Sequence, residues 1–298
     1  MSETVHGVLV VDKPGGMTSH DVVARARRLF GTRAVGHAGT LDPMATGVLV
    51  LLFGEACKLS AYLTGQDKTY SAGVRFGSAT DSLDADGRVT EERTLPAGWL
   101  ARETLDRALA VERARTLQVP PAVSAISEGG RRAYQRVRAG ETVELAPRPV
   151  RVARLELLEW SDAGVDVELE VSKGYYVRAF ARDLGATLGV PAHLGRLRRL
   201  TSGAFSLRDA SPWPPPEPLP PLLPLAQAAL RALPPTRLSR TATAKARRGQ
   251  TLTSDEVEST AGPNEISCWI SPEGELVALG MRTEAGVYRV VRGMRDQS

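Results

Sequence analysis

The 298-residue sequence has only two cysteines, five lysines and no long hydrophobic run. Cys57 and Cys268 are far apart in the chain, which argues against a disulfide framework and predicts a reducing, cytoplasmic location. The longest apolar run, residues 48–53, has the length of a strand and falls short of the ~20 residues that a membrane-spanning helix needs. The N-terminal apolar stretch has no basic flank before it, so we expect neither a signal peptide nor a membrane partner.

The motifs of several common enzyme classes are also missing. The sequence has no GxxxxGK[ST], GxGxxG, GxSxG or HExxH, which disfavours most NTPases, dehydrogenases and hydrolases. The histidines and cysteines show no zinc-ligand spacing, so we expect no metal. Residues 81–87 resemble a calcium loop, but Ser82 and Arg93 then occupy positions that need carboxylates. We expect a turn there, or a loop whose acids orient nearby cations.

Basic residues are abundant and unevenly distributed. The net charge is +4 and the pI is about 9.3, which makes a polyanionic partner plausible. Three clusters stand out: Arg131, Arg132, Arg136, Arg138, Arg148, Arg151 and Arg154; Arg196, Arg198 and Arg199; and Arg240, Lys245, Arg247 and Arg248. A solvated surface usually mixes charges of both signs, so such clusters favour RNA or DNA binding. The alternative is that a GC-rich genome favours arginine codons.

Hydrophobic periodicity predicts both strands and helices. Strands are expected at residues 7–12, 70–76, 165–171, 267–270, 276–280 and 287–291. Helices are expected after a Thr18 or Ser19 cap, at 105–114, at 179–188 before Gly189, and at 225–233. The apolar stretch 45–53 fits either a buried strand or a helix.

A proline-rich stretch predicts the domain organisation. Residues 211–224 contain eight prolines, so they form neither a regular helix nor a central strand and are expected to be a stiff extended connector. We therefore expect one domain over residues 1–235 and a small β-rich module over 236–298.

The segment GHAGTLDPMATG, residues 36–47, has the densest set of unusual residues. Asp42 precedes Pro43 and is biased away from helix, so its carboxylate should be presented on a turn. Gly36 and Gly39 allow a ligand to approach the backbone closely. The alternative is an ordinary turn with a capping aspartate.

Six ordered blocks resemble the bacterial TruB-type tRNA pseudouridine synthases. The blocks are VDKPGGMTSHDVV (11–23), GHAGTLDPMATGVLVLLFGEACK (36–58), DKTYSAGVRFGSATDSLDADG (67–87), QVPPAVSAISEGGRRAYQRVRAG (118–140), VSKGYYVRAFARDLG (171–185) and HLGRLRRL (193–200). The resemblance covers residues 7–208, and the tail is more loosely similar to a PUA-like RNA-binding domain. It implies an α+β catalytic domain with a mixed, largely antiparallel sheet.

The resemblance also implies an activity. Such enzymes isomerise uridine 55 in the T-loop of tRNA to pseudouridine after flipping the base, with one catalytic aspartate, which falls on Asp42. The carboxylate acts as a nucleophile or as a stabiliser of a cationic sugar. The reaction neither oxidises nor imports a group, so no cofactor is expected. The expected partner is the tRNA T-arm, without guide RNA, and we expect a monomer.

Further positions match the family one at a time. Tyr70 matches the tyrosine that stacks on the target base, although a core strand residue is the alternative. Arg178 matches the arginine that pairs with the catalytic aspartate, against the alternative of a surface salt bridge. Tyr176 and Leu197 match the walls of the uracil pocket, and the helical spacing around Leu197 would by itself make it a core residue.

Two residues near the N-terminus and several arginines complete the implied site. His37 matches a histidine that helps to fill the space left by the flipped nucleotide, and Lys13 is expected to orient backbone. Residues 120–150 match a thumb-like RNA-binding insertion. The implied RNA contacts are Arg131, Arg132, Arg136 and Arg199. Ser127 stands where the family commonly has a lysine, which puts one RNA contact in doubt.

Two other functions share these residues. A tRNA-folding helper would use the same arginines without needing catalysis. A guide-RNA-dependent synthase is disfavoured by the short N-terminus and the thumb-like segment. An Asp42→Asn variant that still remodels tRNA but makes no pseudouridine would separate the folding helper from the synthase. Activity on unmodified tRNA without other components would exclude the guide-dependent synthase.

Overall fold

The computed structural model describes residues 5–124, 127, 128, 131, 132, 136, 141, 143 and 145–295. The chain forms two compact units. Unit 1 contains residues 1–42, 48–66 and 202–298, and unit 2 contains residues 43–47 and 67–201. Among the described residues, no helix is both long and apolar enough to cross a membrane.

Unit 2 is built on an antiparallel sheet. Its strands are β11 (Val152–Ser161), β12 (Gly164–Val171), β4 (Lys68–Phe76) and β13 (Ala192–Ser202), in that order. In β12 the apolar residues alternate with acidic ones, and the apolar side chains are buried, as the period of two predicts. The segment around Leu197 is a strand, so its helical spacing was misleading.

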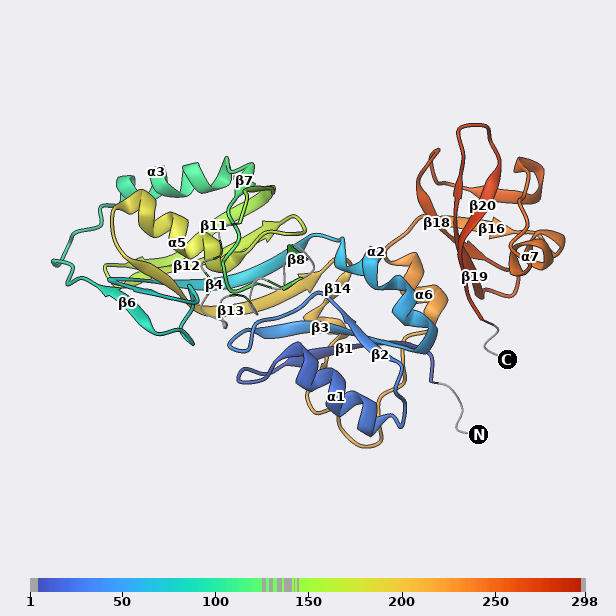
Figure 1. Ribbon diagram of the computed structural model, residues 1–298, viewed down its shortest axis with the longest axis horizontal. Coiled ribbons are helices and arrows are strands. Elements are labelled where there is room, and N and C mark those ends of the chain that lie inside the picture. Colours follow the sequence, from blue (N-terminus) through green and yellow to red (C-terminus); the bar gives the residue numbers. More distant parts are fainter. Residues whose placement is uncertain are drawn as a thin grey trace. The chain divides into compact units, whose positions relative to one another are not determined.

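Two helices cover one face of this sheet. The helices α3 (Arg102–Arg113) and α5 (Val177–Leu188) contact each other, and they pack on β11 and β4, respectively (Figure 1). As expected, α5 ends at Gly189, whose φ of 72° is the left-handed conformation that glycine adopts most readily. The short strands β5 (Ser78–Thr80) and β6 (Val89–Glu92) form a hairpin beyond β4.

The insertion over residues 120–150 has one pair of short strands at its base and a second pair within it. Strand β7 (Leu117–Gln118) pairs with β10 (Arg148–Pro149), and β8 (Ser127–Glu128) pairs with β9 (Arg131–Arg132). The side chains of β8 and β9, and most of the remaining insertion including Arg138, lie outside the described residues. The thumb-like role of this segment therefore stays a prediction.

Unit 1 begins with a second set of strands. These are β1 (Gly7–Lys13), β2 (Val35–Ala38), β3 (Thr46–Phe53) and β15 (Ser211–Pro212). The ambiguous stretch 45–53 forms the strand β3, whose residues 47–53 are all buried. β2 pairs antiparallel with β3, whereas β15 runs parallel to β1, so the sheet is mixed as expected.

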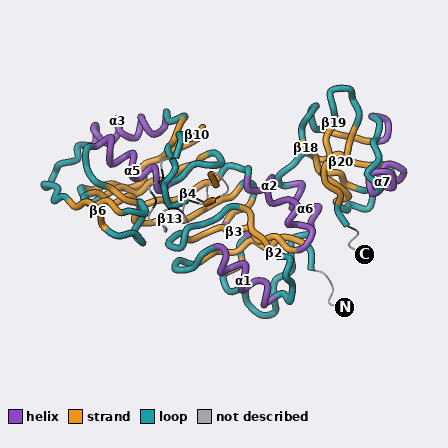
Figure 2. Tube along the Cα trace, in the orientation of Figure 1, coloured by secondary structure: helices purple, strands orange, loops and turns teal. Residues whose placement is uncertain are grey.

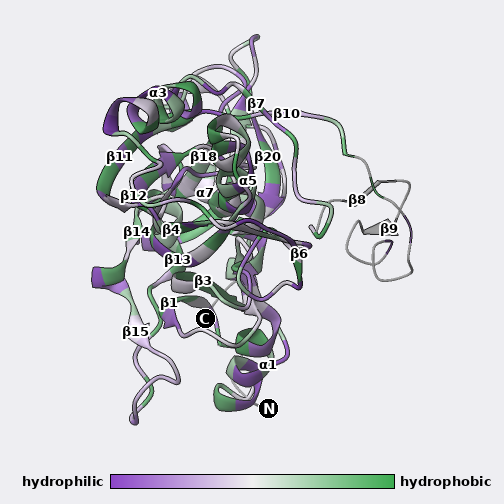
Figure 3. Ribbon diagram, turned by 90° about the vertical axis from the view of Figure 1, so that its left-hand side faces the viewer, coloured by the Kyte–Doolittle hydropathy of each residue, from purple (hydrophilic) through white to green (hydrophobic). Residues whose placement is uncertain are grey.

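The helix α1 (Ser19–Leu29) shows which of two candidate residues caps it. Thr18 accepts a hydrogen bond from the Asp21 N–H, and Asp21 accepts one from the Thr18 N–H, which is a complete capping box. Ser19 is therefore left for another contact, described below. Val22, Val23 and Ala26 are buried, and α1 carries both hydrophobic and hydrophilic residues in Figure 3.

The proline-rich connector is bound to the sheet at both ends. Ser211 aligns with Val11, and Val8 exchanges two backbone hydrogen bonds with Leu223, at 3.0 and 2.8 Å. The connector has no regular structure apart from the two-residue edge strand β15, as expected, but it is not extended, because both of its ends lie against β1. Proline is tolerated there because an edge strand does not need every N–H.

The C-terminal part of unit 1 is a separate β-rich sheet, as expected. Its strands are β17 (Val257–Ser259), β16 (Pro235–Leu238), β18 (Ile266–Ile270), β19 (Leu276–Arg282) and β20 (Tyr288–Gly293). The helix α7 (Arg240–Arg247) packs against β16, β19 and β20 (Figure 2).

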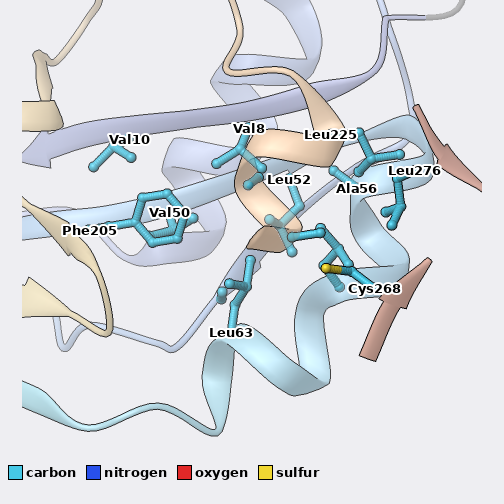
Figure 4. Close-up of a cluster of buried hydrophobic side chains, with 14 of the residues drawn as sticks. Val8, Val10, Val50, Leu52, Ala56, Leu63, Phe205, Leu225, Cys268 and Leu276 are labelled. Atoms are coloured by element: carbon cyan, nitrogen blue, oxygen red, sulfur yellow. The ribbon is translucent and has the colours of Figure 1, made fainter. Parts of the chain in front are cut away.

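This sheet shares a hydrophobic core with the N-terminal strands. Cys268 and Leu276 pack in one buried cluster with Val8 and Leu225 (Figure 4). The cluster includes the helices α2 (Ser60–Thr64) and α6 (Leu225–Leu230) and the 3₁₀ helix η1 (Gly54–Leu59). Lys58 of η1 also donates a 2.8 Å hydrogen bond to the Gly293 carbonyl. The boundary at residue 235 stays a prediction.

Candidate active site

The loop that carries Asp42 is fixed at its centre by Ser19. Ser19 is 1% exposed, and its hydroxyl accepts a hydrogen bond from the Leu41 N–H at 2.8 Å. The same hydroxyl donates to the Leu41 carbonyl at 3.2 Å. Both backbone groups of the residue before Asp42 are thereby satisfied, while Asp42 itself is half-buried in irregular backbone. Nothing in the sequence pointed to Ser19 beyond its candidacy as a helix cap.

The following strand fixes the other end of this loop. Thr46 and Gly47 pair in parallel with Arg198 and Arg199 of β13. Gly47 has a φ of 102°, and a Cβ placed there would lie 2.2 Å from the Arg199 carbonyl oxygen. Only glycine permits this approach. Arg199 is 1% exposed in this structure, and the expectation that it contacts RNA stays a prediction.

The two other expected site residues of unit 1 lie on β1 and β2. Lys13 is fully buried, and its Nζ donates to the carbonyls of Pro14 and Met17 at 2.9 and 2.7 Å. These bonds orient the turn before α1, which is the role expected of this lysine. His37 is half-buried on β2, and its carbonyl accepts a 3.3 Å hydrogen bond from Ser60.

In unit 2, Arg178 sits in the first turn of α5 and is held by the acidic loop at 81–87. Its Nε lies 3.6 Å from the Asp84 carboxylate, and both side chains are at least nine-tenths buried. Its Nη1 and Nη2 donate to the carbonyls of Ser82 and Val123, at 2.9 and 3.0 Å. The Asp84 carboxylate also accepts a hydrogen bond from the Ser82 hydroxyl at 2.5 Å. The acids of this loop orient cations, as one of the two alternatives predicted.

Tyr176 is the residue that caps α5, and its backbone is held by Gln118. The Tyr176 N–H donates to Gln118 Oε1 at 2.8 Å, and Gln118 Nε2 donates to the Tyr176 carbonyl at 3.2 Å. Tyr176 also packs against Leu145. Gln118 is the first residue of one of the six family-like blocks, but no residue pattern marked it as functional. Tyr175 is also buried, and its burial together with the nearby Glu112 carboxylate raises the pKa of its hydroxyl.

The remaining expected pocket residues are buried on adjacent strands. Tyr70 lies on β4 and is 8% exposed, and Leu197 lies on β13 and is 6% exposed. Lys68 precedes Tyr70 on β4 and is also buried. Desolvation, together with the nearby positive charge of Arg199, lowers the pKa of Lys68 to about 8.

Many of the clustered basic residues are paired with acidic side chains. Arg136 binds Glu141 at 2.8 Å and is half-buried. The other pairs are Arg151 with Asp67, Arg154 with Glu168, Arg196 with Asp166, Arg240 with Glu273, Lys245 with Glu256, and Arg247 with Glu275. Acidic side chains therefore lie beside these basic residues, whereas Arg148 and Arg248 are exposed. The side chains of Arg131 and Arg132 lie outside the described residues.

Comparison with known proteins identifies the family. The family model described as "TruB family pseudouridylate synthase (N terminal domain)" matches residues 27–177. The chain belongs to the TruB family of pseudouridylate synthases. It is therefore an isomerase, as the ordered blocks predicted.

Relatives and solved structures agree with TruB-family membership. A "tRNA pseudouridine synthase B" of Mycobacterium sp. (strain KMS) is 47% identical over 278 residues, which cover 92% of this chain and 91% of the relative. A protein of the same name from Nocardia farcinica (strain IFM 10152) is 56% identical over 208 residues, 68% of this chain and 67% of the relative.

The solved structures bear out the fold class of this TruB-family chain. A chain of the "Crystal Structure of a Cbf5-Nop10-Gar1 Complex" aligns with a TM-score of 0.75 at 22% identity, over 98% of this chain and 85% of that chain. A chain of the "Structure of H/ACA RNP bound to a substrate RNA containing 2'-deoxyuridine" aligns with a TM-score of 0.72 at 21% identity, over 98% and 86%.

The described part of this TruB-family chain contains no group of three His, Cys, Asp or Glu side chains placed to hold a metal ion. Its carboxylates near the expected site residues have protein partners instead, as Asp84 does with Arg178. The expectation that the reaction needs no metal and no cofactor stays a prediction.

Proposed function

We propose that this chain converts uridine 55 in the T-loop of tRNA to pseudouridine, with Asp42 as its single catalytic carboxylate. The observation that carries the proposal is the 47% identity to a "tRNA pseudouridine synthase B" over nine-tenths of both chains. Identity at this level over the whole length favours a shared substrate as well as a shared fold.

The chemistry needs few groups. The bond between N1 of uracil and C1′ of ribose breaks, the base turns, and a bond forms between C5 and C1′. The hydrogen on C5 leaves as a proton to water, so the reaction is balanced without an oxidant, a reductant or a second substrate. One carboxylate at C1′ is sufficient, whether it attacks the sugar or stabilises its positive charge.

The position of Asp42 supports this role. Ser19 holds the residue before it, and Gly47 is paired with β13 five residues after it. Thr46, four positions after Asp42 in the chain, pairs with Arg198 of β13, the strand that carries Leu197. We propose that Leu197, Tyr70 and Tyr176 line the uracil pocket.

Arg178 is proposed to act on Asp42 as a cation that keeps the carboxylate ionised and oriented. Its guanidinium is held by Asp84, Ser82 and Val123. A guanidinium with so many fixed partners has little freedom to rotate, which suits a group that must orient another.

The substrate interaction is proposed to follow the family resemblance. The target base is flipped out of the T-loop, and unstacking it costs a few kcal/mol, about the amount that new stacking and phosphate contacts can offset. Arg131, Arg132 and Arg136 are proposed to contact the T-arm, and His37 to help fill the space left by the base. The protein acts as a monomer and without guide RNA.

The test is tritium release from an unmodified tRNA transcript labelled at C5 of its uridines. We expect release by the wild-type protein, none by Asp42→Asn, and none from a transcript carrying cytidine at position 55. Filter binding should give the same tRNA affinity for the wild type and the variant. A wild-type protein that binds tRNA but releases no tritium would contradict the proposal and leave the folding-helper and guide-dependent functions.

A further inference from the structure

We propose that Gln118 is a positioning residue that sets the place of Tyr176 and thereby the rate of isomerisation, while contributing little to RNA affinity. This inference rests on the proposed function, in which Tyr176 forms a wall of the uracil pocket. Gln118 is 2% exposed and forms two hydrogen bonds with the Tyr176 backbone, of 2.8 and 3.2 Å.

The geometry of these bonds specifies a glutamine. Tyr176 has extended backbone, with φ of −109° and ψ of 113°, and such a residue presents its N–H and C=O toward one neighbour, as in a β-sheet. A primary amide offers the matching acceptor and donor. Glutamate has no donor when ionised, and methionine offers neither group. Tyr176 caps α5 without a side-chain hydrogen bond of its own, and Gln118 holds the N–H and the carbonyl of this cap residue.

Gln118 is itself anchored at the base of the insertion. It pairs with Arg148 across β7 and β10, and the Val150 N–H donates to the Thr116 carbonyl at 2.9 Å beside this pair. The outgoing limb of the insertion therefore holds the Tyr176 backbone. The returning limb supplies Leu145, which packs against Tyr176.

Tyr176 is thus held from both limbs of the segment that the family resemblance assigns to RNA binding. A displacement of about 1 Å at a substrate-positioning group can cost about a hundredfold in rate. Loss of the Gln118 amide should accordingly slow the reaction at saturating RNA. RNA affinity should change little, because Gln118 is buried and has no access to phosphates.

The neighbouring attachment of the same limb offers a matched control. Arg182 donates to the Val119 carbonyl at 2.9 Å and binds Asp183, so it fixes the limb one residue away from Gln118. If Gln118 only tethered the limb, Arg182→Met would have the same effect as Gln118→Met. If Gln118 acts on Tyr176, only Gln118→Met should slow the reaction.

The experiment measures single-turnover tritium release with the full-length protein in excess over labelled tRNA, and tRNA binding separately. We expect Gln118→Met to lower the rate about 10- to 100-fold with affinity within about twofold, and Arg182→Met to leave both within about threefold. Circular dichroism checks that each variant is folded. Gln118→Glu, which keeps the size and one acceptor, is the second variant and should also be slow.

A double-mutant cycle then separates the inference from the proposed function. With Tyr176→Leu as the background, Gln118→Met should have no further effect on the rate. Full multiplication of the two effects, or a wild-type rate for Gln118→Met, would overturn the inference and leave the proposed function intact. A wild-type rate for Tyr176→Leu would overturn the pocket role of Tyr176 together with the inference. A wild-type protein without activity would overturn the proposed function and the inference.

Discussion

The hydroxyl of Ser19 binds both backbone groups of Leu41, accepting from the N–H at 2.8 Å and donating to the carbonyl at 3.2 Å. Through this contact the first residue of α1 holds the loop that presents Asp42. The neighbouring Thr18 performs the ordinary capping of the same helix. The two adjacent hydroxyl groups therefore have different roles, and each can be removed by a separate substitution.

Ser19→Ala should reduce both stability and activity. The substitution leaves the buried Leu41 N–H and carbonyl without their partner, which costs about 1–3 kcal/mol of unfolding free energy. Because Asp42 directly follows Leu41, loss of the Ser19 contact should displace the Asp42 carboxylate, and tritium release should fall about tenfold or more. Thr18→Ala is the control: it should cost about 1 kcal/mol through the lost cap and leave the rate nearly unchanged. Equal rates for the two variants would contradict this assignment.

Asp84→Asn should destabilise the protein far more than Asp81→Asn. Asp84 pairs with the buried Arg178, and removing one partner of a buried ion pair costs about 3–5 kcal/mol. Asp81 pairs with Arg88, whose side chain is 93% exposed, so its loss should leave the unfolding free energy nearly unchanged. Urea unfolding of the two variants measures this difference. Similar unfolding midpoints would show that Arg178 does not depend on Asp84.

Gly47→Ala should be among the most damaging single substitutions in the chain. The added Cβ would lie 2.2 Å from the Arg199 carbonyl oxygen, so β3 and β13 cannot keep their pairing. We expect a loss of at least about 3 kcal/mol in urea unfolding. Gly98→Ala, also at a positive φ but with nothing within 4 Å, should cost only about 1 kcal/mol. A small effect at Gly47 would contradict the tight approach.

Lys68 should give the protein a distinct pH dependence. Its pKa is lowered from 10.5 to about 8, so between these values the folded protein has released a proton that the unfolded chain keeps. Stability should therefore rise with pH across this window, by at most about 3 kcal/mol from this residue. Lys68→Met should lack this rise when urea unfolding is compared at pH 7.5 and 9.5. An equal change in unfolding free energy between the two pH values for wild type and variant would show that Lys68 does not cause the rise in stability.

Removal of residues 236–298 should destabilise what remains. Cys268, Ile270, Leu276 and Leu279 are buried against residues of α6 and η1, and deletion would expose that surface to water. We expect the fragment 1–235 to melt at a lower temperature than the full chain and to aggregate on heating. Unchanged melting would instead support an independent module.

Local patterns predicted the elements well where the signal lies within one segment. The alternation in 165–171 and the helical stretch ending at Gly189 both appear in the structure at nearly the expected bounds. The glycines, Pro43 and Asp42 of the 36–47 segment predicted the irregular backbone found at residues 39–45, because turns are specified by nearby residues. The strand β2 within this segment was missed, since its four residues carry too little periodicity.

The contacts that arrange the candidate site could not be predicted in this way. Ser19 with Leu41, Asp84 with Arg178, and Gln118 with Tyr176 are all distant in sequence and meet only in the folded chain. The same holds for several of the acids that pair with the clustered arginines, such as Asp67 with Arg151. Their pairing depends on the tertiary fold, which the pattern of charges along the sequence does not predict.

The discontinuity of unit 1 sets the order in which the chain can fold during synthesis. Unit 2 has all its residues once residue 201 has been made, whereas unit 1 still needs residues 202–298. At about 5–20 residues per second, this interval lasts on the order of 5–20 s. Val8 of β1 obtains its Leu223 and Cys268 neighbours only then. The strand β1, which is synthesised first, therefore gains its neighbour β15 and its Cys268 contact only late in synthesis.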